Sequence, residues 1–160
     1  MKHAKFILGL LFLLIQHFSF AQLCHPDSLE INLIRANQTD GNIAFEGKRH
    51  HPFYNPTCTP QNTLLVYIMG TTDNPTKTIF FPSLAANNGF HVVSLMYENS
   101  KSAKAACADS TDLDCYLNFR REAIEGIDLN TEIAVDYTNS ITNRLIKLLQ
   151  YLDANFSNQG

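Results

Sequence analysis

The stretch LLVYIMGTT (residues 64–72) decides the fold, because six apolar residues run without interruption into a Gly-Thr-Thr turn. An apolar run bounded by turn residues predicts a β-strand that is buried on both faces. Strands of this kind are typical of sheets whose two faces are covered by helices. The sequence around this stretch therefore has to supply those helices and at least one neighbouring strand.

Downstream, the sequence predicts a helix and a second buried strand. Residues 76–88 place apolar side chains at helical spacing, and the Asn-Asn-Gly sequence at 87–89 is a typical helix end. Residues 90–97 (FHVVSLMY) form another apolar run. A strand, a short helix and a strand at this spacing form a βαβ unit. We therefore expect the two strands to lie parallel in one sheet.

Two more helices are predicted after this unit. One runs from Asp112, a candidate N-cap, to Gly126, a good helix stop. The other, over residues 138–156, is the clearest in the chain, with one apolar face made by Ile141, Leu145, Leu148, Leu149, Leu152 and Phe156. A face of this width is expected to pack on the sheet.

The N-terminal arm, residues 22–61, has weaker periodicity. Short strands are predicted around residues 31–33 and 43–45, with the turn between them at Asp40-Gly41. Three prolines between His50 and Pro60 predict an irregular connection. On this interpretation His50 and His51 lie in solvent.

Residues 1–21 have the pattern of a cleavable secretory signal peptide. Lys2 and Lys5 precede an apolar core, and Ser19 and Ala21 are small residues at the −3 and −1 positions of a cleavage site. We therefore predict a secreted or periplasmic protein with no membrane segment after cleavage. Loss of the two lysines moves the formal net charge from −3 to −5, and no basic stretch remains that would bind nucleic acid.

All four cysteines lie in the exported part of the chain. An even number of cysteines in an oxidising compartment favours disulfides, and four cysteines allow three connectivities. We favour Cys107–Cys115, which closes an acidic loop, together with Cys24–Cys58, which ties down the arm. A metal site is the weaker alternative, because neither Cys-x-x-Cys nor zinc-ligand spacing occurs. No cofactor is predicted.

Four segments, LLVYIMGTT, NNGFHVVSLMYEN, CYLNFRREAIEGID and NSITNRLIKLLQYLDANFSNQG, together resemble secreted proteins of the α/β-hydrolase fold. The resemblance covers residues 62–160 and implies an α/β fold. We expect a partial three-layer sandwich, in which an incomplete, mostly parallel sheet is flanked by helices. In these hydrolases the Gly-x-Ser-x-Gly turn follows the helix matching residues 138–156, and the acid and histidine come later. All three triad members would then fall beyond Gly160, so no catalytic residue is predicted here.

The resemblance also makes Gly70, Thr71 and Thr72 candidates for an oxyanion-binding loop. The alternative is an ordinary strand-to-helix turn that needs glycine. Relatives tend to have a Gly-Thr-Gly-Gly type of loop, whereas Thr72 and Asp73 occupy the last two positions here. These residues restrict the backbone, and the carboxylate of Asp73 would repel a developing negative charge.

Two hypotheses for function follow. In the first, the chain is the N-terminal portion of an exported esterase-like serine hydrolase, whose intact relatives act on small ester or acyl substrates, and is inactive alone. In the second, it is a non-catalytic secreted binding module built on a hydrolase-derived half-fold. In both, a partner or the missing C-terminal part covers the edge of the sheet.

Overall fold

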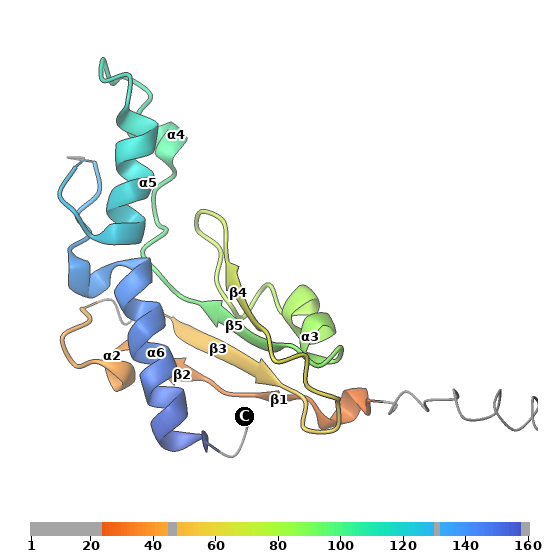
Figure 1. Ribbon diagram of the computed structural model, residues 1–160. Helices are drawn as coiled ribbons and strands as arrows, with labels where there is room; N and C mark the ends of the chain where they lie inside the picture. The colour runs from red at the N-terminus through yellow and green to blue at the C-terminus, as the bar shows by residue number, and fades with distance from the viewer. Residues whose placement is uncertain (1–23, 45–47, 130–131, 158–160) are drawn as a thin grey trace, which may run out of the picture.

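The computed structural model describes residues 24–44, 48–129 and 132–157 (Figure 1). Its strands are β1 (Glu30–Ile31), β2 (Ile34–Arg35), β3 (Arg49–Tyr54), β4 (Leu64–Ile68) and β5 (His91–Leu95). Its α-helices are α2 (Ala36–Thr39), α3 (Phe80–Ala86), α4 (Ala103–Ala106), α5 (Cys115–Glu125) and α6 (Ile141–Asn155). Two 3₁₀ turns, η1 (Pro26–Ser28) and η2 (Tyr137–Asn139), complete the described elements.

The strands form one mixed sheet in the order β1-β3-β5-β4, and β2 also pairs with β3. β4 and β5 are parallel over their whole length, from Leu64 opposite His91 to Ile68 opposite Leu95. The α/β class and the parallel pair of the βαβ unit are therefore confirmed. The sheet is mixed rather than mostly parallel, because β3 runs antiparallel to β1, β2 and β5.

Helices cover both faces of this sheet, and the alternation of side chains along β5 shows how. Val93 packs with Leu148 of α6 in one buried cluster, whereas Val92 packs with Ala85 and Ala86 of α3 in another. Successive side chains of a strand point to opposite faces. The described residues thus form three layers, with α6 on one face and α3 on the other (Figure 1).

The helices begin and end close to the predicted residues. α5 ends at Gly126, whose φ of 70° is left-handed and is adopted by glycine without strain. α6 begins after Ser140, whose hydroxyl accepts a hydrogen bond from the Asn143 N–H at 3.1 Å. α3 is shorter than predicted and begins at Phe80.

The prediction of an irregular connection over residues 50–60 was wrong, because β3 occupies Arg49–Tyr54. Pro52 lies in this central strand although it has no N–H to donate. Its carbonyl accepts a hydrogen bond from the Asn32 N–H at 3.0 Å, so its nitrogen faces the same side, where the neighbouring edge is interrupted between β1 and β2. The proline is tolerated because its missing donor faces that interruption.

The predicted hairpin in the arm was also wrong in its pairing. Residues 31–33 are only partly strand, the short helix α2 follows β2, and residues 43 and 44 are not strand. β1 and β2 pair with β3 instead of with residues 43–45, the last of which lies outside the described residues. As a result His50 and His51 lie in the sheet with exposed fractions of 0% and 5%, which corrects the prediction that they lie in solvent.

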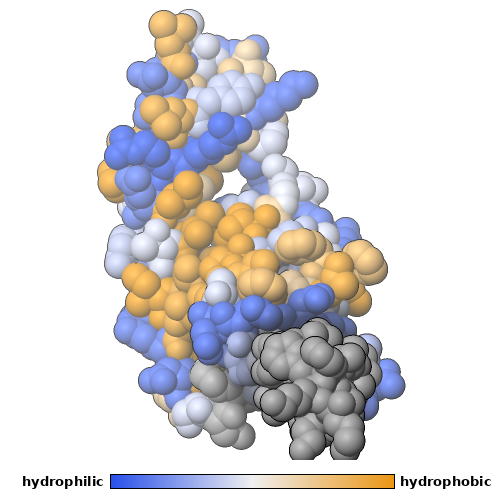
Figure 2. All heavy atoms as spheres, turned by 45° about the vertical axis from the view of Figure 1, so that its right-hand side comes forward, coloured by the Kyte–Doolittle hydropathy of each residue, from blue (hydrophilic) through white to orange (hydrophobic). Residues whose placement is uncertain are grey.

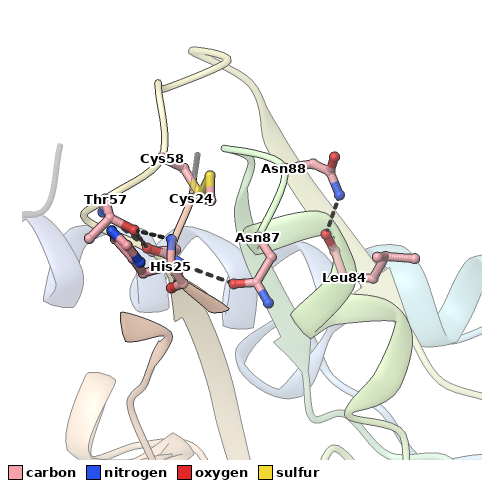
Figure 3. The surroundings of a disulfide bond; sticks show 8 residues. Cys24, His25, Thr57, Cys58, Leu84, Asn87 and Asn88 are labelled. Carbon is pink, nitrogen blue, oxygen red and sulfur yellow. Dashed lines mark hydrogen bonds between the residues drawn. A yellow bond between two sulfur atoms is a disulfide. The ribbon is translucent and has the colours of Figure 1, made fainter. Parts of the chain in front are cut away.

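The structure contains both favoured disulfides, Cys24–Cys58 and Cys107–Cys115, with Cα–Cα distances of 4.6 and 5.9 Å. Figure 3 shows that the first bridge lies beside a small hydrogen-bonded group. There the His25 N–H donates to Thr57 Oγ1 at 2.9 Å, and Asn55 Nδ2 donates to Asn87 Oδ1 at 2.8 Å. The bridge joins the start of the arm to Cys58, and the Asn55–Asn87 hydrogen bond links the same region to the end of α3.

The predicted signal peptide, residues 1–21, lies outside the described residues. Among the residues that are described, no helix is long and apolar enough to cross a membrane.

The prediction that the strand at residues 64–68 is buried on both faces was wrong, because β4 lies at one end of the strand order and none of its residues is fully buried. Apolar side chains are exposed on β4 and on α3. Figure 2 shows apolar side chains gathered across the middle of the molecule. The exposed large apolar residues of β4, of α3 and of the residue before α3 are Leu64, Ile68, Ile79, Phe80, Phe81 and Leu84.

Candidate functional site

The candidate loop, residues 69–79, connects the carboxyl end of β4 to α3. Gly70, Thr71 and Thr72 are all exposed. A Cβ atom built on Gly70 would meet nothing within 4 Å, and the φ angle of Gly70 is not in the left-handed region. The turn therefore does not need glycine at position 70.

The left-handed position of the loop is occupied by Thr72, with a φ of 63°. A β-branched residue rarely adopts this conformation, which glycine takes at no steric cost. The Thr72 N–H donates a hydrogen bond to the Asn99 carbonyl at 2.8 Å. Because this N–H already has an acceptor, Thr72 is not available as an oxyanion donor.

Asn99, just beyond the carboxyl end of β5, holds the loop in place. Its side-chain Nδ2 donates to the carbonyl oxygens of Gly70 at 2.7 Å and of Asp73 at 3.0 Å. Asn99 is 7% exposed, so these hydrogen bonds are shielded from water. Together with the bond from Thr72, they fix both ends of the turn to β5.

Thr71 is the remaining candidate donor. Its N–H makes no hydrogen bond to any other residue that the structure describes, and Thr71 lines a cleft. The carboxylate of Asp73 is engaged in its own turn, where Oδ1 accepts from the Asn74 N–H at 2.9 Å. Among the described residues, neither the Gly70 N–H nor the Thr71 N–H has a hydrogen-bond acceptor, and of these two residues only Thr71 lines the cleft.

This cleft has a volume of about 400 Å³ and lies where the carboxyl ends of β4 and β5 meet α5 and α6. Open sheets with parallel strands commonly bind ligands outside the carboxyl ends of those strands. The apolar part of its wall consists of Ile68, Ala103, Phe119, Ala123, Ile124 and Ile141. The polar part consists of Thr71, Tyr97, Glu98, Asn99, Lys101, Ser102, Lys104, Tyr116 and Arg120.

Of the three cations that line this cleft, two have no ion-pair partner among the described residues. Lys101 forms an ion pair with Glu132. Within the described residues, neither Lys104 nor Arg120 has a carboxylate oxygen within 4.0 Å. Glu98 and Asp136 both interact with the buried Arg144, whose pKa is lowered to about 10 by burial although these two carboxylates raise it in part.

Two of the hydroxyl groups that line the cleft, those of Tyr97 and Ser102, stabilise the fold. Tyr97 donates its hydroxyl to the Met69 carbonyl at 2.7 Å, and burial raises the pKa of this phenol. Ser102 Oγ accepts from the Ala105 N–H at 3.0 Å and caps α4. Among the described residues that line the cleft there is no histidine to act as a base. The cleft therefore has donors and cations but no serine–histidine pair.

A serine and a histidine do lie side by side elsewhere, because Ser94 of β5 is opposite His51 of β3. Their exposed fractions are 0% and 5%, so a substrate has no access to them. In the described part of the chain, Ser94 Oγ and His51 Nδ1 make no hydrogen bond, either to each other or to another group. This pair lacks the hydrogen bond that activates a nucleophile.

His50 is a structural residue. Its Nδ1 accepts a hydrogen bond from the Met96 N–H at 3.0 Å, next to β5. Burial, assisted by the positive charge of Arg144 and by His51, lowers the pKa of His50 to about 3. The imidazole is therefore neutral at physiological pH, which suits the acceptor role of Nδ1.

The sequence did not predict the hydrogen bonds that the Glu122 and Asn99 side chains make to nearby backbone groups. The Glu122 carboxylate, with 2% exposure, accepts from the Leu129 N–H at 3.1 Å and the Val135 N–H at 3.3 Å. It thereby shapes the segment after α5. A glutamate four residues before the Gly126 helix stop is a weak signal for this role, and Asn99 offered only its place after a strand.

The described residues contain no cluster of three or more histidine, cysteine or acidic side chains that could hold a metal ion. Comparisons of the chain with protein-family models, with curated proteins and with solved structures found no match.

Proposed function

We propose that this chain is the N-terminal portion of an exported α/β-hydrolase-fold protein and that it supplies the oxyanion side of an esterase-like site. The observation that carries the proposal is the position of Thr71. Thr71 lines a cleft beyond the carboxyl ends of two parallel strands, in the loop that leads to the first crossover helix, and its N–H has no acceptor among the described residues.

The order of the strands supports this position. β1 and β2 both pair with β3, so they act as one interrupted edge strand, and β4 is then the third strand of the sheet. In α/β-hydrolases the loop between the third strand and its helix contributes an N–H to the oxyanion hole. The loop after β4 is the equivalent segment, and α3 is the equivalent helix.

On this proposal the chain contributes electrostatic stabilisation and no nucleophile. The Thr71 N–H would donate to the oxygen on which negative charge develops during acyl transfer. Asn99 keeps that N–H in a fixed orientation, so little reorganisation is needed. The serine and the base would come from a segment that packs beside β4, whose outer edge is not paired with another described strand.

The purified chain should not hydrolyse p-nitrophenyl esters of short acids. Turnover that a serine-directed phosphonate abolishes would contradict the absence of a nucleophile. The DNA downstream of the Gly160 codon provides a second measurement. A strand followed by Gly-x-Ser-x-Gly, in frame or after a frameshift, would support the hydrolase proposal.

The second candidate function is a secreted binding module on the same half-fold. It is favoured by the chemistry of the cleft, where Lys104 and Arg120 are available to a ligand while Ser102 and Tyr97 are engaged in structural hydrogen bonds. A clean stop after Gly160 together with a monodisperse, inactive product would favour this function. The two disulfides fit export in either case.

A further inference from the structure

We infer that the cleft beyond β4 and β5 binds a small amphipathic carboxylate, with its anionic head at Lys104 and Arg120 and its apolar tail against α5 and α6. This assigns a class of ligand to the cleft. It rests on the proposed function in one respect, which is that the same cleft is taken as the binding site.

The charge of the cleft carries the first step. Four charged side chains line it, Glu98, Lys101, Lys104 and Arg120, and Glu132 pairs with Lys101. Arg144 interacts with two carboxylates, Glu98 and Asp136. The four cations, Lys101, Lys104, Arg120 and Arg144, outnumber these three carboxylates by one, so the cleft and its surroundings have a net positive charge in a chain whose net charge is −3. A cation that lines a cavity without a carboxylate partner favours an anionic ligand group.

The apolar wall carries the second step. Phe119, Ala123 and Ile124 project from one side of α5 into the cleft, and Ile141 of α6 and Ile68 of β4 complete this surface. A wall of this kind gives no hydrogen bonds to a free phosphate or sulfate. It does favour a hydrocarbon chain, because each Å² of apolar surface removed from water contributes about 25 cal/mol of favourable free energy.

The size of the cavity limits the ligand. Small-molecule sites have volumes of about 300–1,000 Å³, and the cleft, at about 400 Å³, lies near the lower end. A monocarboxylate with a chain of medium length matches both the volume and the division into a cationic and an apolar part.

Two features keep the cleft open in a defined shape. The Cys107–Cys115 disulfide joins the end of α4 to the start of α5, which carries Arg120. Asn99 fixes the loop that carries Thr71. Lys104 and Arg120 therefore project from segments that are tied to one another and need little ordering when a ligand binds.

The test is a titration of the ¹⁵N-labelled, oxidised full chain with hexanoate, followed by NMR. Hexanamide, which has the same shape but no charge, is the matched ligand control. The variants are Arg120→Gln and Lys104→Gln. Arg121→Gln is the matched protein control, because Arg121 is the next residue of α5, pairs with Glu125 at 3.1 Å and does not line the cleft.

We expect saturable shifts of the Thr71 and Ala123 amide signals with hexanoate. Each cation variant should weaken binding by about tenfold, in line with a hydrogen bond to a charged group, while Arg121→Gln should bind as the unsubstituted chain does. Equal affinity for hexanamide, no saturable shift, or unchanged binding in both cation variants would overturn the inference.

The outcome of this titration does not decide whether the proposed function is correct. The hydrolase proposal depends on the ester assay and on the DNA beyond Gly160, neither of which measures binding of hexanoate. Because Lys104 and Arg120 are exposed and make no ion pair with a described residue, their substitution should leave the fold unchanged, and thermal unfolding by circular dichroism checks this.

Discussion

Replacing Thr72 with glycine should stabilise the protein, although glycine in a loop normally destabilises. Thr72 has a φ of 63°, its side chain is exposed, and its N–H bond to the Asn99 carbonyl does not depend on the side chain. The substitution therefore removes steric strain and no described hydrogen bond. Thr71 is the matched control, because it is the same residue type, is exposed, and has no left-handed φ.

The magnitude follows from two opposing terms. The left-handed conformation costs a residue with a Cβ about 1–2 kcal/mol, and glycine removes this cost at position 72. Glycine also increases the entropy of the unfolded chain, which destabilises by about 0.5–1 kcal/mol. We expect Thr72→Gly to gain about 0.5–1 kcal/mol on balance and Thr71→Gly to lose a similar amount, since only the second term acts there.

The measurement is reversible unfolding of the oxidised chain in urea, with the free energy of unfolding extrapolated to water for both variants. The difference between them should be about 1–2 kcal/mol in favour of Thr72→Gly. If Thr71→Gly is the more stable variant, the left-handed strain at Thr72 does not exist and the proposed geometry of the loop is wrong.

Three further predictions concern the parts that support the loop and the sheet. Gly126→Ala should destabilise the protein by at least about 3 kcal/mol in urea unfolding, because the new Cβ would lie 2.3 Å from the backbone of Tyr137. Gly70→Ala is the control: a Cβ at position 70 meets nothing within 4 Å, so the free energy of unfolding should change by less than about 0.5 kcal/mol. Asn99→Ala should cost about 2–3 kcal/mol in the same assay, because it leaves two loop carbonyls without their donor. The pKa of His50 is lowered from 6.5 to about 3 in the folded state, so between these values the unfolded state binds more protons. The free energy of unfolding should therefore decrease as the pH is lowered, by about 3 kcal/mol between pH 7 and pH 4. Unfolding at several pH values checks this, and a pH profile unchanged in His50→Asn would contradict it.

The central part of the fold was predictable because its signals are local. Residues 64–68 are apolar throughout, and residues 141–155 have one apolar face, so strand and helix follow from short windows of sequence. The parallel pairing of β4 and β5 also followed, because a helix connects them. The α/β class needs no more information than this.

The arm was not predictable in the same way, because its structure depends on a distant neighbour. β3 contains Pro52, which argues against a central strand when read alone. It is a strand because β5 lies on one side of it and an interrupted edge lies opposite the proline on the other. The burial of His50 and His51 follows from that pairing.

The candidate site, too, was predictable from the sequence only in part. The sequence placed the loop at Gly70, Thr71 and Thr72, and the structure brings all three to the carboxyl end of β4. Which N–H is free could not be predicted, because it depends on Asn99, which is 27 residues beyond Thr72. Lys104 and Arg120 likewise come from α4 and α5, which the sequence does not connect to the loop.

Thr72 also bears on the objection that this loop lacks the glycines that the proposed resemblance to α/β-hydrolases leads one to expect. A missing glycine weakens an oxyanion loop only if the backbone takes a different path. Here Thr72 adopts the left-handed conformation that glycine would adopt, and Asn99 provides three hydrogen bonds that hold it there. Strained residues persist where the surrounding structure fixes them, and they are frequent at functional sites. The direction of the Thr71 N–H therefore depends on the backbone path and on Asn99. Glycine at position 72 should relieve the strain without changing that direction. An amide signal of Thr71 that shifts with hexanoate equally in Thr72→Gly and in the unsubstituted chain would show that the path is retained.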